Sequence, residues 1–324
     1  MALGIGWSVS SSKSTPNITV EATCAKNRAG ASTRTLAAMP WCPYTDLELP
    51  DEAMNSEHII PLSLGGSNQF CIPVEKDFNA KVGSKIDGVL ANDVLTLMRR
   101  REFDARGHSN TPPTVLLKKS HLGDEKRPIQ VTLRGKEGML VWDAMTKRHL
   151  EPDEIGENTI SSQFNLDAHG RKRFVAKVAL SAGYFIYGEL FRTHVRHNEL
   201  RALMNFSSES KREDFANFGL RGYDEFSRAE DADKEQNELL RLFCQFIKGS
   251  CVIAGVGPSN IVISVGILGK WIGSLNIPAV TDSFPLEGEH DLGHVVALCE
   301  GKVATLSYRQ LVKDVHEILE RKRG

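Results

Sequence analysis

The chain has 324 residues, of which 41% are hydrophobic and 25% charged, and this composition excludes a disordered or fibrous protein. A chain of this length can bury a sizeable core and suggests two domains, with three as the alternative. The formal net charge is −1, so attraction to a polyanion has to come from a local basic patch.

The cysteines and the apolar segments bear on where the protein works. Six cysteines without paired spacing favour free thiols over a disulfide framework. No apolar run approaches the roughly 20 residues that a membrane helix needs. The apolar start, residues 2–7, is short and lacks the basic residues of a signal peptide. We therefore expect a cytoplasmic protein with no membrane partner.

The first half of the chain contains a predicted hairpin followed by a helix. Residues 1–19 are rich in Ser and predict a flexible N-terminal segment. Pro61 ends a first strand, the glycines of residues 65–68 let the chain reverse, and a second strand covers residues 70–74. From Glu75 the hydrophobic period changes from two to about 3.6. One apolar helical face then contains Phe78, Val82, Ile86, Val89, Leu90, Val94 and Leu97.

The hairpin contains the residue types of a hydrolytic site. Glu57 and His58 stand side by side, and such a pair can combine a metal ligand with a general base. Asn79, in the first turns of the helix, would add another oxygen ligand. Neighbouring side chains of a regular strand point to opposite faces, so the pair can share one metal only if the strand ends or twists there. Two surface polar residues are the alternative interpretation.

Taken in order, His58, the glycine loop with Asn68, the short second strand and the helix with Asn79 resemble the HNH endonucleases, which contain a ββα-metal motif. The resemblance covers residues 40 to 100, and residues 41–46 are similar to the Cys-x-Tyr-Thr-Gly turn of several members. It implies that His58 is the general base, that Glu57 and Asn79 bind a divalent cation, and that Asn68 braces the loop. Mg²⁺ is the expected cation, with Mn²⁺ as an alternative.

The chain also departs from that family. Many members carry two Cys-x-x-Cys pairs around a structural zinc, whereas Cys42 and Cys71 have no near partner, so no structural zinc is expected. The interval from Asn68 to Asn79 is longer than the usual pattern, which weakens the assignment of Asn68 more than those of His58 and Asn79.

Basic residues gather after the hairpin. Between Lys76 and Lys136 the sequence has thirteen Lys and Arg against seven Asp and Glu. Lys81 and Lys85, four residues apart on one helical side, would bind the phosphates that flank the cut bond, and Arg99 and Arg100 continue this patch. Ordinary solvated side chains are the alternative for each of them.

The rest of the chain alternates between strands and helices. Residues 115–117, 129–133 and 139–142 predict strands that extend the first domain, and the acidic stretch 151–158 predicts a linker. A helical pattern over residues 171–206 is interrupted by Gly183 and Gly188. Further helices are expected at 235–247 and 312–319, and strands at 251–254, 261–265, 294–299 and 302–307. Pro258 after Gly255 and Gly257 argues against a nucleotide-binding loop.

These patterns predict an α+β protein. Residues 1–19 would be a flexible segment, 20–150 an HNH-like nuclease domain and 151–324 a helix-plus-sheet accessory domain. The expected function is metal-dependent hydrolysis of DNA, in a restriction or defence context. The alternative is a catalytically silent nucleic-acid-binding protein with the same framework. RNA as a substrate, and a homodimer or partner protein bound through the accessory domain, remain open.

Overall fold

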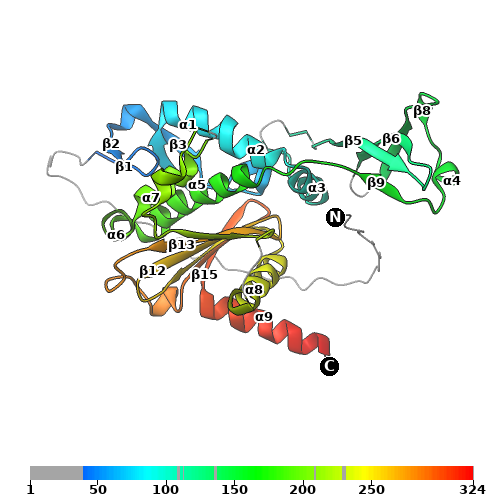
Figure 1. Ribbon diagram of the computed structural model, residues 1–324. Helices are drawn as coiled ribbons and strands as arrows, with labels where there is room; N and C mark the ends of the chain where they lie inside the picture. The colour runs from blue at the N-terminus through cyan, green and yellow to red at the C-terminus, as the bar shows by residue number, and fades with distance from the viewer. Residues whose placement is uncertain are drawn as a thin grey trace. The chain divides into compact units, whose positions relative to one another are not determined.

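The computed structural model describes residues 39–107, 110–111, 113–134, 137–207, 209–227 and 231–323, which form helices and antiparallel sheets in an α+β fold (Figure 1). The chain divides into two units between Thr35 and Leu36, and all described residues belong to the second unit. The predicted flexible segment, residues 1–19, lies outside the described residues. No helix in the described ranges is long and apolar enough to cross a membrane.

Two small hairpins precede the first helix. Strands β1 (Trp41–Cys42) and β2 (Leu47–Glu48) form the first, and β3 (Met54–His58) pairs antiparallel with β4 (Cys71–Glu75) to form the second. The register of the second hairpin places Glu57 opposite Ile72 and His58 opposite Cys71. Helix α1 (Lys76–Val82) follows at once, so the predicted order of strand, strand and helix is observed.

The continuous helix predicted after Glu75 is interrupted. Helix α1 passes through a π-helical turn (Gly83–Asp87) into α2 (Gly88–Ala91), and a separate helix, α3 (Val94–Glu102), begins after a break. The break has a local cause, because the Asp93 side chain accepts a hydrogen bond from the Thr96 backbone and so caps α3. A π-helical turn is rare and occurs frequently at functional sites.

The C-terminal half contains a six-stranded antiparallel sheet in the order β10-β13-β12-β11-β14-β15. Its strands are β10 (Arg221–Asp224), β11 (Ser250–Val256), β12 (Asn260–Ile267), β13 (Lys270–Pro278), β14 (His294–Cys299) and β15 (Lys302–Ser307). The four predicted strands of this region are confirmed. The sequence analysis missed β10 and also β13, whose Gly273, Ser274 and Asn276 weaken the strand signal.

Helices cover both faces of this sheet (Figure 1). They are α5 (Ala168–Tyr187), α6 (Glu189–His194), α7 (His197–Met204), α8 (Asp231–Ile247) and α9 (Tyr308–Arg323). The predicted pattern over 171–206 splits at Gly188, which has a φ of +54°. Along β11, Val252 and Ala254 join the core on the α5 face, whereas Cys251 and Ile253 pack towards α8 and α9. This alternation explains why both faces of the sheet are apolar.

One hydrophobic core joins the hairpins, α1, α2, α5 and the six-stranded sheet, for example through Ile60, Phe70, Phe174 and Ile263. This core contains residues from both sides of residue 150, where the sequence analysis predicted a domain boundary. The segment between α3 and α5 instead has its own core, which contains Leu117, Leu122, Ile129, Val131, Val141 and Leu150.

That second core belongs to a five-stranded sheet in the order β8-β7-β6-β5-β9. Its elements are β5 (Val115–Leu122), β6 (Arg127–Leu133), β7 (Met139–Asp143), β8 (Arg148–His149), α4 (Pro152–Ile155) and β9 (Ile160–Ser162). The strands predicted at 115–117, 129–133 and 139–142 are confirmed. The predicted linker, 151–158, contains α4 and leads into β9, which pairs with β5.

Candidate active site

His58 and Asn68 meet across the second hairpin. His58 is the last residue of β3, and its Nε2 lies 2.8 Å from Oδ1 of Asn68 in the loop before β4. Because an amide oxygen only accepts hydrogen bonds, this contact places a hydrogen on Nε2 and leaves Nδ1 as the basic nitrogen. The amide of Asn68 is therefore placed to orient the His58 ring, whereas the resemblance implied that Asn68 braces the loop.

The loop that carries Asn68 is fixed by its glycines and by the C-terminal sheet. A Cβ at Gly66 would lie 1.8 Å from the carbonyl oxygen of Ile60, so only glycine fits there. The Ser67 hydroxyl donates to the carbonyl of Gly301 at 2.7 Å, and the Ser250 hydroxyl donates to the carbonyl of Leu64 at 2.5 Å. The position of Asn68 thus depends on strands that are distant in sequence, since 186 residues separate Leu64 from Ser250.

Glu57 points away from the loop and pairs with a buried lysine of α5. The Lys177 side chain is 0% exposed, and its Nζ lies 2.6 Å from Oε1 of Glu57 and 3.2 Å from Oδ2 of Asp87. The same ammonium group donates to the carbonyls of His58 at 2.9 Å and Ile59 at 3.3 Å. Burial lowers the pKa of Lys177, but the nearby carboxylates more than offset burial and hold it above its ordinary value. Lys177 is therefore a charged, fully satisfied group beneath the hairpin.

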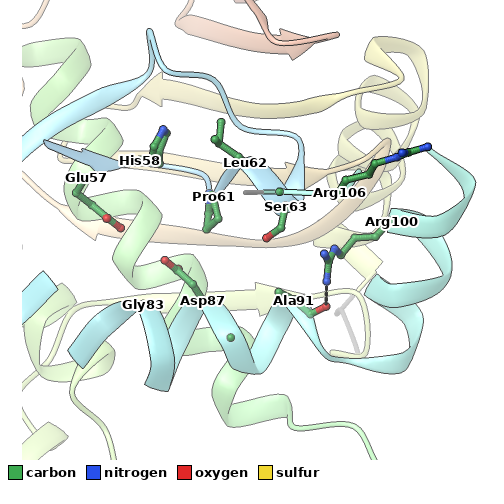
Figure 2. A pocket seen from close by; sticks show the side chains of 12 residues that line it. Glu57, His58, Pro61, Leu62, Ser63, Gly83, Asp87, Ala91, Arg100 and Arg106 are labelled. Atoms are coloured by element: carbon green, nitrogen blue, oxygen red, sulfur yellow. Dashed lines mark hydrogen bonds between the residues drawn. The ribbon is translucent and has the colours of Figure 1, made fainter. Parts of the chain in front are cut away.

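Asp87, in the π-helical turn, has one carboxylate oxygen without a partner. The residue is 8% exposed, and its Oδ1 is buried and accepts no hydrogen bond. Burial raises the pKa of Asp87 to about 6, and the charge of Lys177 opposes this shift. Figure 2 shows the carboxylates of Glu57 and Asp87 directed towards each other across a pocket of about 370 Å³. The two acids thus line one pocket and share the ammonium group of Lys177.

Asp87 should give the protein a measurable pH dependence. Its ordinary pKa is 3.8 and its pKa in the fold is about 6. The folded state therefore binds this proton more tightly, and the stability that protonation adds is lost as pH rises from about 4 to above 6. We expect Asp87 to lower the free energy of unfolding by about 3 kcal/mol across that range.

Urea unfolding of the wild type and Asp87→Asn at a series of pH values measures this effect. The difference in unfolding free energy between the two proteins should change with pH in the stated direction. A difference that stays constant from pH 4 to pH 8 would contradict the assignment.

Asn79 pairs with Asn55 and does not line the pocket with Glu57. The amide Nδ2 of Asn79 donates to Oδ1 of Asn55 at 3.0 Å, and Asn79 is not among the residues that line the pocket. Glu57 and His58 both line it, but their side chains leave β3 on opposite sides (Figure 2). In the described ranges no group of three or more His, Cys, Asp and Glu is arranged to hold a metal ion.

The residues of the pocket nevertheless fit a hard cation in their chemistry. Mg²⁺ is bound in proteins through one or two carboxylates together with water and substrate phosphates. Glu57 and Asp87 line the same pocket, and one carboxylate oxygen of Asp87, the buried Oδ1, has no hydrogen-bond partner. Asp87, unlike Asn79, lines the pocket together with Glu57.

The predicted phosphate-binding residues occupy different environments. Lys81 and Lys85 are exposed on α1 and the π-helical turn. Arg99 donates through Nε and Nη2 to the carbonyl of Leu268, at 3.1 and 2.7 Å, and so ties α3 to the β12–β13 turn. Arg100 is buried and lines the pocket.

Sequence analysis did not identify Asp87 or Lys177. A signal for Lys177 is present, because it is the single charge within the apolar run from Phe174 to Leu180. A lysine is almost never fully buried unless it is paired, so that run implies an acidic partner. Nothing local indicates that the partners are Glu57 and Asp87.

No family model, curated protein or solved structure matches this chain. Any functional conclusion therefore depends on the residues of the hairpin and the pocket.

Proposed function

We propose that this protein is a metal-dependent HNH-type endonuclease that hydrolyses phosphodiester bonds of DNA. The observation that carries the proposal is the 2.8 Å contact between His58 and Asn68, at the end of a two-stranded hairpin that leads directly into a helix. A histidine whose Nε2 is held by an amide can take a proton from water at Nδ1. His58 is then the general base, and Asn68 is the residue that orients it.

The backbone at Asp46 gives independent support. This residue stands where the similar turn of several HNH members has glycine, and it adopts a φ of +65°. Glycine adopts this left-handed conformation freely, and Asp is among the few other residues that tolerate it. The turn at 41–46 therefore retains the backbone form that the family's glycine favours.

The residues that would bind the divalent cation differ most from those that the resemblance implies. Glu57 would be one ligand, as the resemblance implies, and Asp87 would be the other unless the Asn79 amide leaves Asn55. When bound, Mg²⁺ or Mn²⁺ supplies stabilisation of the charge that develops on phosphorus and the leaving oxygen. Lys177 limits the negative charge of the two acids and holds the carbonyls of His58 and Ile59 beside them.

Contacts with DNA would fall on the phosphate backbone. Lys81 and Lys85 are exposed on α1 and on the π-helical turn, which follow the hairpin. Such contacts give affinity that decreases with salt and contain little sequence information. Recognition of a site or of a partner protein is then left to the C-terminal sheet and its helices.

A second candidate is a nucleic-acid-binding protein that has lost catalysis. The pairing of Glu57 with the buried ammonium of Lys177 favours it, because an occupied carboxylate is a weaker metal ligand. This candidate predicts salt-dependent binding of DNA without cleavage under any metal condition.

Cleavage of supercoiled plasmid by the purified protein distinguishes the two. We expect nicked or linear DNA with Mg²⁺ or Mn²⁺ at low salt, and none with a chelator. A parallel reaction with structured RNA decides the substrate class. Binding without cleavage at every metal and salt condition would favour the silent protein, and the absence of both would reject both candidates.

A further inference from the structure

Arg100 is a buried cation without an acidic partner. The residue is 9% exposed, and its only described hydrogen bond runs from Nη1 to the carbonyl of Ala91, at 2.9 Å. Its Nε is buried and has no partner. Within the described ranges no Asp or Glu forms an ion pair with it, so much of the donor capacity of this guanidinium is unused.

Two other buried cations of the fold have acidic partners. Arg171, which is 1% exposed, forms ion pairs with Asp93 and Glu225, and Lys177 has Glu57 and Asp87. An unpaired buried charge destabilises a protein, because desolvation is not compensated by a partner. Burial accordingly lowers the pKa of Arg100, with no opposing charge. The hydrogen bond from Arg100 to the carbonyl of Ala91, the last residue of α2, therefore leaves the charge of Arg100 without an acidic partner.

The guanidinium of Arg100 lies in the same pocket as the proposed site. It lines the pocket together with Glu57, His58 and Asp87, and it extends from α3 next to Ala91 (Figure 2). The two carboxylates approach each other elsewhere in the pocket, so acidic and basic groups occupy different parts of its wall. A pocket of about 370 Å³ has the size of a small-ligand site.

We propose that Arg100 binds a phosphate group of a single nucleotide unit that enters this pocket, at a strand end or in a single strand. A guanidinium binds phosphate through paired N–H donors. A bound phosphate would also give Arg100 the negatively charged partner that it does not have in the fold. The pocket has the volume of a small-ligand site, which suits one nucleotide unit. The identification of the ligand as nucleic acid rests on the proposed function, whereas the phosphate site itself does not.

Binding measured without divalent cations tests this proposal separately from catalysis. With a chelator present, inorganic phosphate and a short single strand with a 5′-phosphate should raise the melting temperature of the wild type. The same strand without its 5′-phosphate and a closed circular duplex should have weaker effects. If neither phosphate nor the phosphorylated strand stabilises the wild type, the phosphate site is rejected, whatever the plasmid assay shows.

Substitutions of Arg100 and of its neighbour Arg101 test whether Arg100 binds the phosphate. We expect Arg100→Met to weaken binding of the phosphorylated strand by about tenfold or more, because it removes hydrogen bonds to a charged group. Arg101→Met is the matched control, since Arg101 is the next residue of α3 and pairs with Glu137 outside the pocket. Equal affinity of Arg100→Met and the wild type overturns the proposal. If Arg100→Met does not fold, Arg100→Lys takes its place and should show intermediate affinity, and unchanged affinity again overturns the proposal.

Discussion

His58→Ala is expected to lower the rate of DNA cleavage by about 10²–10⁴-fold, which is the usual contribution of a general base. Binding of DNA should be unchanged, because the substitution removes a proton acceptor and no positive charge. The site makes this expectation specific, since Asn68 holds Nε2 at 2.8 Å and leaves Nδ1 to take the proton. Initial rates of plasmid nicking at saturating Mg²⁺, together with gel-shift affinity in a chelator, measure both quantities.

Three further variants make the result interpretable. His316→Ala is the matched control, because His316 is exposed on α9, and it should cleave like the wild type. Asn68→Ala should be slower than the wild type but faster than His58→Ala, since it disturbs only the orientation of the ring. The double variant should be no slower than His58→Ala alone, because both residues act through one proton transfer. Wild-type rates in His58→Ala would reject a catalytic role for this histidine.

The hairpin was the part of the fold most open to prediction, because its signals are local. Pro61 and the Gly65-Gly66 pair mark where the chain turns, and the change of hydrophobic period marks where the helix starts. Asn68 lies ten residues from His58, so a short hairpin brings them together with few alternatives. The sequence analysis expected Asn68 only to brace the loop and did not predict its contact with His58, and the loop that carries Asn68 is held by the C-terminal sheet.

The acidic part of the pocket could not be predicted in the same way. Glu57 is held by a lysine that is distant in sequence, and the contact exists only because α5 packs against the hairpin. Asp87 faces the pocket because a π-helical turn replaces regular helix there, which changes the direction of the side chains. Neither long-range packing nor that change of helical period leaves a clear local pattern.

The domain prediction differed from the structure for a related physical reason. Acidic and polar composition at 151–158 is typical of a linker, but composition does not reveal which apolar surfaces pack together. The hairpins need α5 and the C-terminal sheet to bury residues such as Phe70 and Leu64. The proposed nuclease elements and the C-terminal elements therefore share a core, and the intervening five-stranded sheet has a separate one.

Lys177 supports this shared core, and Lys177→Met is expected to lower the free energy of unfolding by about 3–5 kcal/mol. Methionine fills a similar volume, so the effect arises from charge. Without the ammonium group, Glu57 and Asp87 would face each other as buried, uncompensated carboxylates, and the carbonyls of His58 and Ile59 would lose their donor. Urea unfolding followed by circular dichroism measures the change, at a pH of about 7.5 so that Asp87 is ionised.

Two comparisons separate loss of charge balance from loss of packing. Lys172→Met is the control on the same helix, because the Lys172 side chain is 44% exposed and its ion pair with Asp224 is long, at 3.7 Å. This substitution should change the free energy of unfolding by no more than about 1 kcal/mol. Combining Lys177→Met with Glu57→Gln and Asp87→Asn removes both carboxylates as well and should recover a large part of the lost stability, since replacing a whole buried ionic group is far less harmful than breaking it. If the triple variant is no more stable than Lys177→Met, packing and not charge explains the loss. If Lys177→Met unfolds like the wild type, the buried ion cluster does not stabilise the fold, and the approach of α5 to the hairpin has another cause.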